Sequence, residues 1–242
     1  MTPSKKLLLI HIFCHLMIIP GIIYGEFWMF VCSFLWWQWV AATSISAGYH
    51  RYFSHRSFKT GKWYSWYVQI LALFANPGPV LTWSATHRMH HAYSDTENDP
   101  HSPKYKGFWK IYFSMWGDDN ITIKRKFLAG LLKDSSVKFF YENYFRLVVL
   151  LIVVLFLIDP MLMIFGYCMT VVQAFHGYGL LNATTHKYGS PRNSTIANIL
   201  TAGEGWHKNH HDSSRDWIIG KKWWQIDTGA LWIRCIKKKE EA

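Results

Sequence analysis

Apolar residues fill two long stretches of the chain, 7–50 and 147–186, and neither stretch contains a lysine or an arginine. A helix that crosses a bilayer needs about 20 predominantly apolar residues, so each stretch is long enough for two crossings. Turn-forming residues interrupt each stretch near its middle, at Gly25-Glu26 and at Asp159-Pro160. The pattern therefore predicts two helical hairpins, and with them an all-α integral membrane protein that crosses the membrane four times.

The segments outside the hairpins, residues 49–144 and 182–242, are predicted to form one helical cap, so that residues 1–242 make a single domain. Two lysines precede the first apolar run, as they would in a signal peptide. No small-residue cleavage site follows and a second apolar run begins at once, so we expect a retained helix. The four predicted transmembrane helices cover about residues 7–24, 27–48, 145–158 and 161–181.

The cap carries the positive charge, and the net charge of the chain is +11. Lysine and arginine mark the cytoplasmic side of membrane proteins, so the cap and both termini are predicted to be cytoplasmic. A basic face suits anionic lipid head groups or an acidic protein partner, although it could also serve only to orient the protein. We expect no nucleic-acid partner, because no fold signature for nucleic-acid binding occurs.

Shorter patterns lie between the hairpins. Residues 62–75 are aromatic and apolar but too few for a crossing, which predicts a helix in the membrane interface. Residues 81–92 are predicted to be helical. From residue 107 to residue 145 aromatic and basic residues alternate, which again suits the interface. With this assignment the two hairpins both return to the same side of the membrane.

Histidine occurs in three tightly spaced boxes: His50-x4-His55, His87-x2-His90-His91 and His207-x2-His210-His211. Residues three and four positions apart share one face of a helix, so each of the last two boxes is expected to offer three imidazoles to one point. The topology adds His186, because the second hairpin returns to the cytoplasmic side there, as the first does at His50. Nine histidines are therefore expected to converge where the hairpins leave the membrane.

Nine imidazoles exceed the needs of one ion, so the sequence predicts two metal ions. Imidazole binds iron, zinc, copper and nickel, and affinity alone would favour zinc or copper. Iron is inferred from the reaction: a hydrophobic bundle suggests an acyl or hydrocarbon substrate, and unactivated C–H bonds require oxygen chemistry that redox-silent zinc does not perform. Asp95, Asp99 and Glu204 lie near the boxes, either to hold imidazole N–H groups or merely to solvate loops and cap helices.

Four further histidines lie outside the boxes. His11, His15 and His176 fall within predicted transmembrane helices, where ionisable residues are candidates for function by default. We expect hydrogen-bonded contacts between helices there rather than metal coordination. His101 lies in a polar loop, and we expect it to form hydrogen bonds or to orient a neighbour.

The order and spacing of the boxes resemble those of the membrane fatty acyl desaturases of the stearoyl-CoA, or delta-9 acyl-CoA, type. The residues that carry the resemblance are Ala85-Thr-His-Arg-Met-His-His-Ala-Tyr-Ser-Asp95, Asp99-Pro-His-Ser-Pro103 and Gly203-Glu-Gly-Trp-His-Lys-Asn-His-His211. The sequences around the boxes are similar to those of bacterial members, which implies that the protein lies in the bacterial inner membrane. The resemblance covers residues 27–230.

The resemblance implies four transmembrane helices that carry a cytoplasmic cap around a di-iron centre. It implies that Asn182 completes the metal shell through a water molecule and that Trp83 lines the bend of an acyl tunnel. Residues below His50 on the second helix, namely Thr43, Trp39 and Phe34, are expected to set the depth of that tunnel. The implied ligands are His50, His55, His87, His90, His91, His186, His207, His210 and His211.

In such an enzyme O2 and two electrons remove two hydrogens from a fatty acyl thioester or acyl lipid and leave a cis double bond, here expected at delta-9. The sequence has no haem, iron–sulfur or dinucleotide motif, so a separate electron donor is expected: a ferredoxin, a rubredoxin-like protein or a b-type cytochrome. Such donors are commonly acidic, so the basic face would steer their docking.

Two other functions use membrane-bound metal sites. A membrane di-iron hydroxylase of acyl chains or hydrocarbons uses similar boxes, but it would leave an oxygen in its product. A metal transporter would place its ligands along a path near the middle of the bilayer. The boxes lie instead at one end of the predicted helices, so transport is the least favoured function.

Overall fold

The computed structural model of the protein describes residues 1–114 and 121–238, and all regular secondary structure within these ranges is helical. The elements are α1 (Pro3–Tyr24), α2 (Phe27–Val40), η1 (Ala41–His55), α3 (Trp63–Ala72), α4 (Val80–Tyr93), α5 (Pro103–Lys106), α6 (Phe108–Tyr112), η3 (Arg125–Leu128), α7 (Ser135–Ile158), α8 (Pro160–Leu162), η4 (Met163–Cys168), α9 (Met169–Thr185), α10 (Thr195–Leu200), α11 (His207–Asp212) and α12 (Thr228–Ile236).

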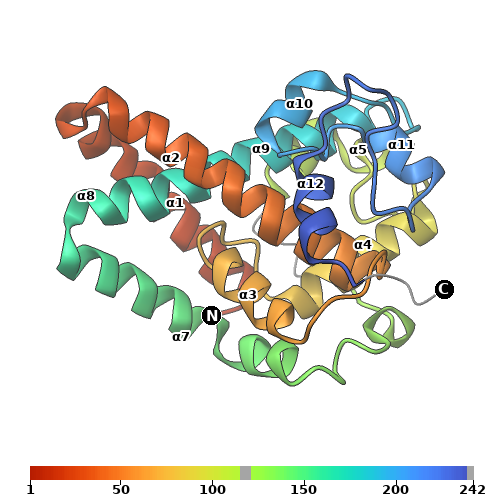
Figure 1. Ribbon diagram of the computed structural model, residues 1–242, viewed down its shortest axis with the longest axis horizontal. Coiled ribbons are helices and arrows are strands. Elements are labelled where there is room, and N and C mark those ends of the chain that lie inside the picture. The colour runs from red at the N-terminus through yellow and green to blue at the C-terminus, as the bar shows by residue number, and fades with distance from the viewer. Residues whose placement is uncertain (115–120, 239–242) are drawn as a thin grey trace.

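The long helices lie on one side of the molecule and the short helices on the other. In Figure 1 the helices α1, α2, α7 and α8 project to the left, whereas α4, α5, α10, α11 and α12 gather on the right. Helix α9 contacts both α1 and α2 and leads from the long helices into the cap. The structure thus has the two parts that the apolar pattern predicts, a helical bundle and a helical cap.

Within the described ranges, two helices are long and apolar enough to cross a bilayer, α1 with 22 residues and α7 with 24. Helices α2 and α9 are shorter, with 14 and 17 residues. Each adjoins a segment in which the backbone hydrogen bonds widen to the π-helical pattern, η1 after α2 and η4 before α9. The helical hairpins turn where the sequence predicts, between α1 and α2 and between α7 and α8.

Helix α7 begins earlier than expected. The apolar pattern predicts that the third long helix starts at about residue 145, but it starts at Ser135. The reason is a local cap: the Asp134 carboxylate accepts a hydrogen bond from the backbone N–H of Ser136. The segment 107–145 is therefore not one interfacial element, because its last eleven residues belong to α7.

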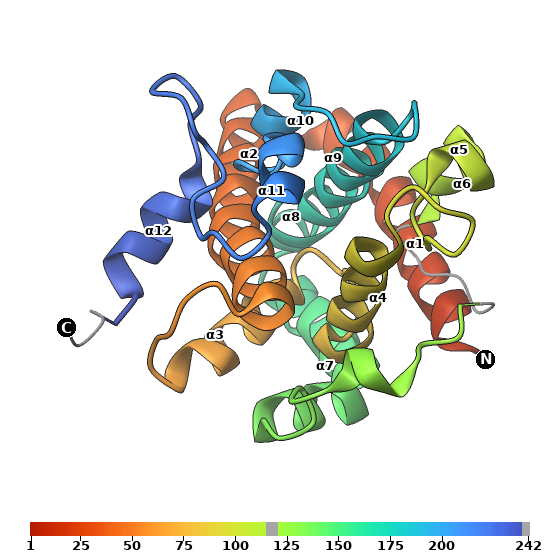
Figure 2. The ribbon, with the colours of Figure 1, turned by 90° about the vertical axis from the view of Figure 1, so that its right-hand side faces the viewer.

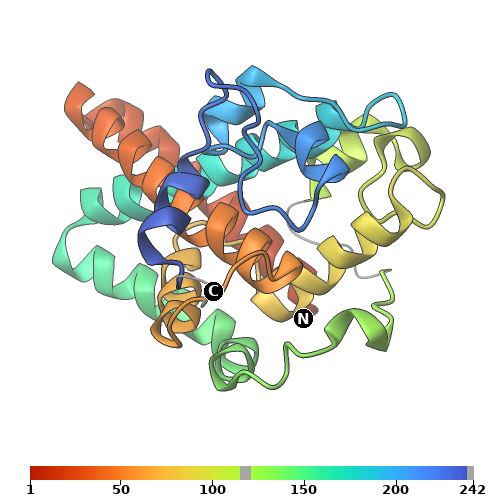
Figure 3. The ribbon, with the colours of Figure 1, turned by 45° about the vertical axis from the view of Figure 1, so that its right-hand side comes forward.

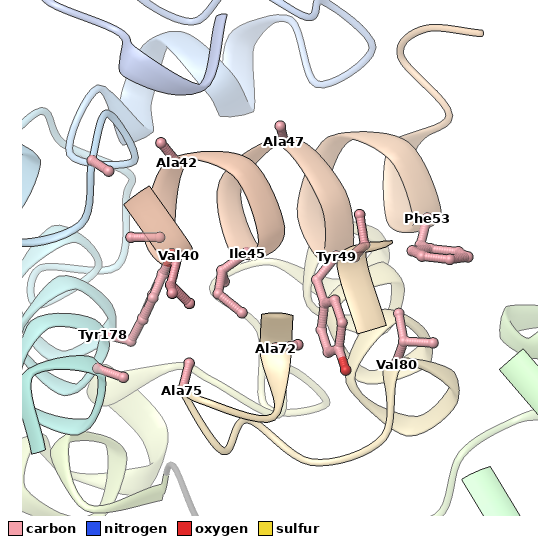
Figure 4. Packing of buried hydrophobic residues seen from close by; sticks show 14 of the residues in the cluster. Val40, Ala42, Ile45, Ala47, Tyr49, Phe53, Ala72, Ala75, Val80 and Tyr178 are labelled. Carbon is pink, nitrogen blue, oxygen red and sulfur yellow. The ribbon is translucent and has the colours of Figure 1, made fainter. Parts of the chain in front are cut away.

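The helix that starts at Phe27 also continues further than expected, through η1 to His55, so that the first histidine box is part of the helix. Helix α3 packs tightly on η1 at Gly48, where a Cβ atom would lie 2.5 Å from the Val68 side chain. Only glycine permits this approach. Figure 4 shows Ile45 and Tyr49 of η1 pointing towards Ala72 and Ala75 in the core that joins bundle and cap.

Candidate metal centre

The structure brings all nine histidines of the sequence prediction together, in two adjacent groups. Within each group the potential ligand nitrogens lie within 4.8 Å of one another. In Figure 2, which looks onto the cap, α11 lies between the helix that continues α2 and helices α4 and α9. The five-histidine group consists of His50, His55, His87, His91 and His210, and the four-histidine group of His90, His186, His207 and His211.

Each H-x-x-H-H box is divided between the two groups, which corrects the expectation that a box offers three imidazoles to one point. In α4, His87 and His91 join the five-histidine group and His90 joins the other. At 3.6 residues per turn, positions i and i+4 differ by about 40°, whereas position i+3 lies about 60° away on the opposite side. One short helix thus serves both groups. Helix α11 divides its box in the same way, with His210 in the five-histidine group.

The H-x4-H box depends on the π-helical form of η1. In an α-helix, residues five apart differ by about 140°, so His50 and His55 would point away from each other. The i→i+5 hydrogen bonds of a π-helix widen the turn and bring such residues towards one face. The two rings lie with centroids 4.9 Å apart. The unusual helix geometry therefore places the whole first box in one group.

The ring nitrogens face one another at distances that suit a shared cation. In the five-histidine group, the Nε2 atom of His210 lies 2.9 Å from those of His50 and His91. In the four-histidine group, Nε2 of His207 lies 2.9 Å from that of His186 and 3.2 Å from that of His211. Metal–imidazole bonds of about 2.1 Å at right angles would place two nitrogens about 3.0 Å apart. Both groups fit metal ions.

Carboxylates hold the opposite nitrogens of three of these rings. The Nδ1 atom of His50 lies 2.5 Å from Glu204. The Nδ1 of His90 lies 2.8 Å from Asp99, and that of His186 lies 3.0 Å from Asp95. A ring that donates its Nδ1–H to a carboxylate presents a lone pair at Nε2, as a metal ligand must. The interpretation that these three acids hold imidazole N–H groups, rather than merely solvating loops or capping helices, is confirmed.

Burial favours the neutral, metal-binding form of three of these histidines. Burial and the neighbouring imidazoles lower the pKa values of His87, His90 and His207 well below the usual range. Glu204 is also buried, which raises its pKa, but His50 and Arg51 outweigh this effect and hold the pKa at about 2. Neutral imidazoles and an ionised carboxylate are the states required to bind a cation.

A cavity of about 950 Å³ opens onto both groups. Its lining includes His50 and His87 of the five-histidine group and His90 and His207 of the four-histidine group. Apolar and aromatic side chains from the bundle and the cap form much of the remaining wall, namely Leu7, Leu8, Ile45, Trp83, Trp109, Ile111, Tyr178 and Leu181. An apolar chain can therefore reach both groups from within the protein.

The other predicted site residues are distributed around this cavity. Asn182 and Trp83 line it, and the Trp83 ring stacks on His87 at 5.2 Å. Among the residues that the structure describes, Thr43, Trp39 and Phe34 are not part of its lining. Thr43 is buried and accepts a hydrogen bond from Tyr67, whereas Trp39 and Phe34 are 46% and 39% exposed. The wall residues that α1 and α6 contribute were not predicted from the sequence, because only tertiary packing brings these helices to the boxes.

The remaining histidines lie outside both groups. His15 Nδ1 donates to the carbonyl oxygen of His11 at 2.6 Å, and His15 and His176 face each other at 3.3 Å. The Tyr112 hydroxyl lies 2.7 Å from His176. These are the helix contacts expected for His15 and His176. The same expectation is wrong for His11, because neither of its buried ring nitrogens has a hydrogen-bond partner among the described residues. The backbone N–H of His101 donates to Asp99, so His101 helps to hold the carboxylate that orients His90.

Comparison with known proteins identifies the family. The model of the fatty acid desaturase family matches residues 9–234. The chain is 33% identical over 214 residues, 84% of its length, to an sn-1 stearoyl-lipid 9-desaturase of Synechocystis, of which it covers 67%. It is 36% identical over 78% of its length to an acyl-CoA 5-desaturase of Anemone leveillei, of which it covers only 62%.

A third relative extends the range of chemistry. The chain is 27% identical over 85% of its length to a hex-5-enoyl-[acyl-carrier protein] acetylenase of Moorena producens, of which it covers 78%. The three names cite three different acyl carriers: a lipid, coenzyme A and acyl-carrier protein. The match over most of the chain, together with two histidine groups that can hold metal, shows that this chain belongs to the fatty acid desaturase family.

Proposed function

We propose that this chain is an oxygen-dependent acyl desaturase that introduces a cis double bond, at delta-9, into a fatty acyl chain. The observation that carries the proposal is the cavity whose apolar walls end at both histidine groups. A uniform methylene chain offers no polar group near the reacting carbons. Its position must therefore be set by the shape of the cavity, which holds the chain against the metal centre.

Two iron ions are the proposed cofactors, one in each histidine group. When bound, they would supply the redox chemistry with O2 that zinc cannot supply. The protein contributes the rest: nine imidazoles would hold the ions, and Glu204, Asp99 and Asp95 would fix the orientation of three rings. Asn182 lines the cavity one turn before His186, which supports the proposal that it holds a water molecule beside the four-histidine group.

The proposed topology is that of a multi-pass protein of the bacterial inner membrane, with the cap and both termini in the cytoplasm. Helices α1 and α7 are the two apolar candidates for crossing. We propose that α2 with η1, and α8 to α9, are the other two, since each follows one of these candidates after a tight turn. The turns at the opposite ends of these helices carry no lysine or arginine.

The electrons would come from a separate donor: a ferredoxin, a rubredoxin-like protein or a b-type cytochrome. The net charge of +11 favours an acidic donor. The substrate would be an acyl thioester or an acyl lipid, since relatives are named for each of these carriers. Membrane lipids would surround the bundle.

Expression in a bacterial host that lacks desaturases tests the proposal. Membranes of the host are expected to gain fatty acids with one cis double bond at carbon 9, detected by mass spectrometry after derivatisation of the double bond. Growth without oxygen should abolish the product. A hydroxylated fatty acid would point to the alternative hydroxylase, and no oxygen-dependent product with any of the donors would refute the proposal.

The shape of the cavity predicts where chain length is measured. Ile45→Trp adds volume inside the cavity and is expected to shift the products towards shorter chains. The sequence predicts the same kind of shift for substitutions of Thr43, Trp39 and Phe34, which lie outside the lining. Fatty acid profiles of the four variants show whether chain length depends on Ile45, inside the cavity, or on the three residues outside it. An unchanged profile for Ile45→Trp would show that this cavity does not measure the acyl chain.

A further inference from the structure

Arg51, the residue after His50, is completely buried, and its guanidinium joins two carboxylates. Its Nη2 atom donates to Asp227 Oδ1 at 2.8 Å and its Nη1 atom to Asp227 Oδ2 at 3.1 Å. Nη2 also donates to Glu204 Oε1 at 3.2 Å. A two-pronged arginine–carboxylate pair fixes both partners in angle as well as in distance. Arg51 thus connects residues that are far apart in the sequence.

Glu204 extends this connection to the metal centre. Its Oε2 atom lies 2.5 Å from His50 Nδ1, and its Oε1 atom accepts from Ser46 Oγ at 2.5 Å as well as from Arg51. Both oxygens of the carboxylate are therefore held. The result is one continuous path of polar contacts from Asp227 through Arg51 and Glu204 to His50.

Asp227 anchors the far end of this path at the beginning of α12. Its carboxylate accepts from the backbone N–H of Ala230 and from that of Ile219, both at 2.9 Å. Figure 1 and Figure 3 both show α12 lying beside the helix that continues α2, and α12 contacts η1. The fold of the C-terminal segment and the orientation of His50 thus depend on the same side chain.

Gly229 shows how close this approach is. A Cβ atom on Gly229 would lie 2.5 Å from Ser46 Oγ and 3.2 Å from Arg51 Nη2. Any other residue would push α12 away from the two side chains that hold Glu204. Substitution of Gly229 therefore disturbs the path without removing a charge.

The four-histidine group is supported in a different way. Its carboxylates, Asp95 and Asp99, come from a single loop after α4. Asp99 accepts from the backbone N–H groups of Asp95 and His101, both at 2.8 Å. This support is local to the loop, whereas that of His50 extends to the C-terminal helix.

We propose that Arg51 and Asp227 are positioning residues that make α12 part of the support of the five-histidine group, so that their loss weakens metal binding at that group selectively. The proposal rests on the proposed function in one respect, that both groups hold metal. Residues that orient a metal-bound imidazole typically contribute 10- to 100-fold to metal affinity. We expect a loss of that size at one group and none at the other.

The test measures metal ions per chain, by elemental analysis after dialysis against a competing chelator, for Asp227→Asn, Arg51→Lys and Gly229→Ala. Asp134→Asn is the matched control, because Asp134 also caps a helix, but its carboxylate bonds within the described residues lead to Ser136 and Ser65 rather than to a histidine. In these three variants, the number of metal ions per chain is expected to fall from two towards one. The control is expected to keep two ions per chain, even if its midpoint of thermal unfolding falls as much as that of the three variants. Gly229→Ala keeps the test open if the charge variants do not fold.

Two double variants, each built on Asp227→Asn, identify which ion is lost. Adding His210→Ala, in the five-histidine group, should cause no further loss from Asp227→Asn, whereas adding His186→Ala should remove the remaining ion. Equal loss from both groups, no loss, or the same loss in Asp134→Asn would overturn the proposal. A wild-type chain that holds fewer than two ions would instead contradict the proposed di-metal function.

Discussion

Replacing His210 or His186 by alanine is expected to abolish desaturation, with product falling by at least about 100-fold, because each variant removes a ligand from one group. His210 is central to the five-histidine group, since its Nε2 atom lies 2.9 Å from two other ring nitrogens. His186 is one of only four in its group. Fatty acid analysis of the expression host measures product, and elemental analysis of the purified protein measures bound metal.

The matched control for both variants is His176→Ala. His176 lies in α9, the helix that precedes His186, but it contacts Tyr112 and His15 rather than either group. It should leave the metal content of the protein unchanged. If His210→Ala and His186→Ala formed wild-type amounts of unsaturated product, the two histidine groups would not be the catalytic centre.

Asp99→Ala is expected to weaken metal binding at the four-histidine group by about 10- to 100-fold. Asp99 is fully buried and accepts hydrogen bonds from His90 Nδ1 and from two backbone N–H groups. Without it, the His90 ring is free to rotate. Each donor left unpaired in the interior also costs about 1–3 kcal/mol of folding stability. Competition with a chelator measures the affinity, and thermal unfolding of the metal-free protein measures the stability.

Asp212→Ala provides the comparison for this prediction. Asp212 lies at the end of α11, next to the histidine box, but its carboxylate is 58% exposed and pairs with Lys208. An exposed ion pair contributes about 1 kcal/mol or less. Metal affinity and stability should both stay close to those of the wild type. Equal effects of Asp99→Ala and Asp212→Ala would mean that Asp99 does not orient His90.

The sequence predicted well those features that depend on neighbouring residues. Runs of apolar residues and the turn residues between them predicted the helical hairpins, and the turns lie between α1 and α2 and between α7 and α8 as expected. Helix boundaries set by one side chain were harder to predict. The cap by Asp134 starts α7 about ten residues before the expected position, since a single hydrogen bond leaves little trace in a hydrophobic pattern.

The nine histidines were predicted because residue type and spacing are properties of the sequence itself. Their division into two groups was not, because it depends on which helix faces a given imidazole. In the sequence, His90 lies between His87 and His91, which both belong to the five-histidine group. His90 nevertheless joins the group of His186, because α9 ends on that side of α4. A spacing rule describes one helix and contains no information about the helix opposite.

The residues that support and surround the site were the least accessible to sequence reasoning. Ile111 lines the cavity although it lies far from every box, because α6 packs on α9. Arg51 is a basic residue next to a predicted ligand, but only the approach of α12 turns it into a buried link to Asp227.

The sequence by itself determined the helical class, the two hairpins and the set of nine imidazoles, because hydrophobicity, turns and spacing act between near neighbours. Tertiary structure alone decided the two histidine groups, the cavity that meets them both and the path from α12 to His50. Each of these joins side chains from elements distant in sequence, and their distances depend on packing.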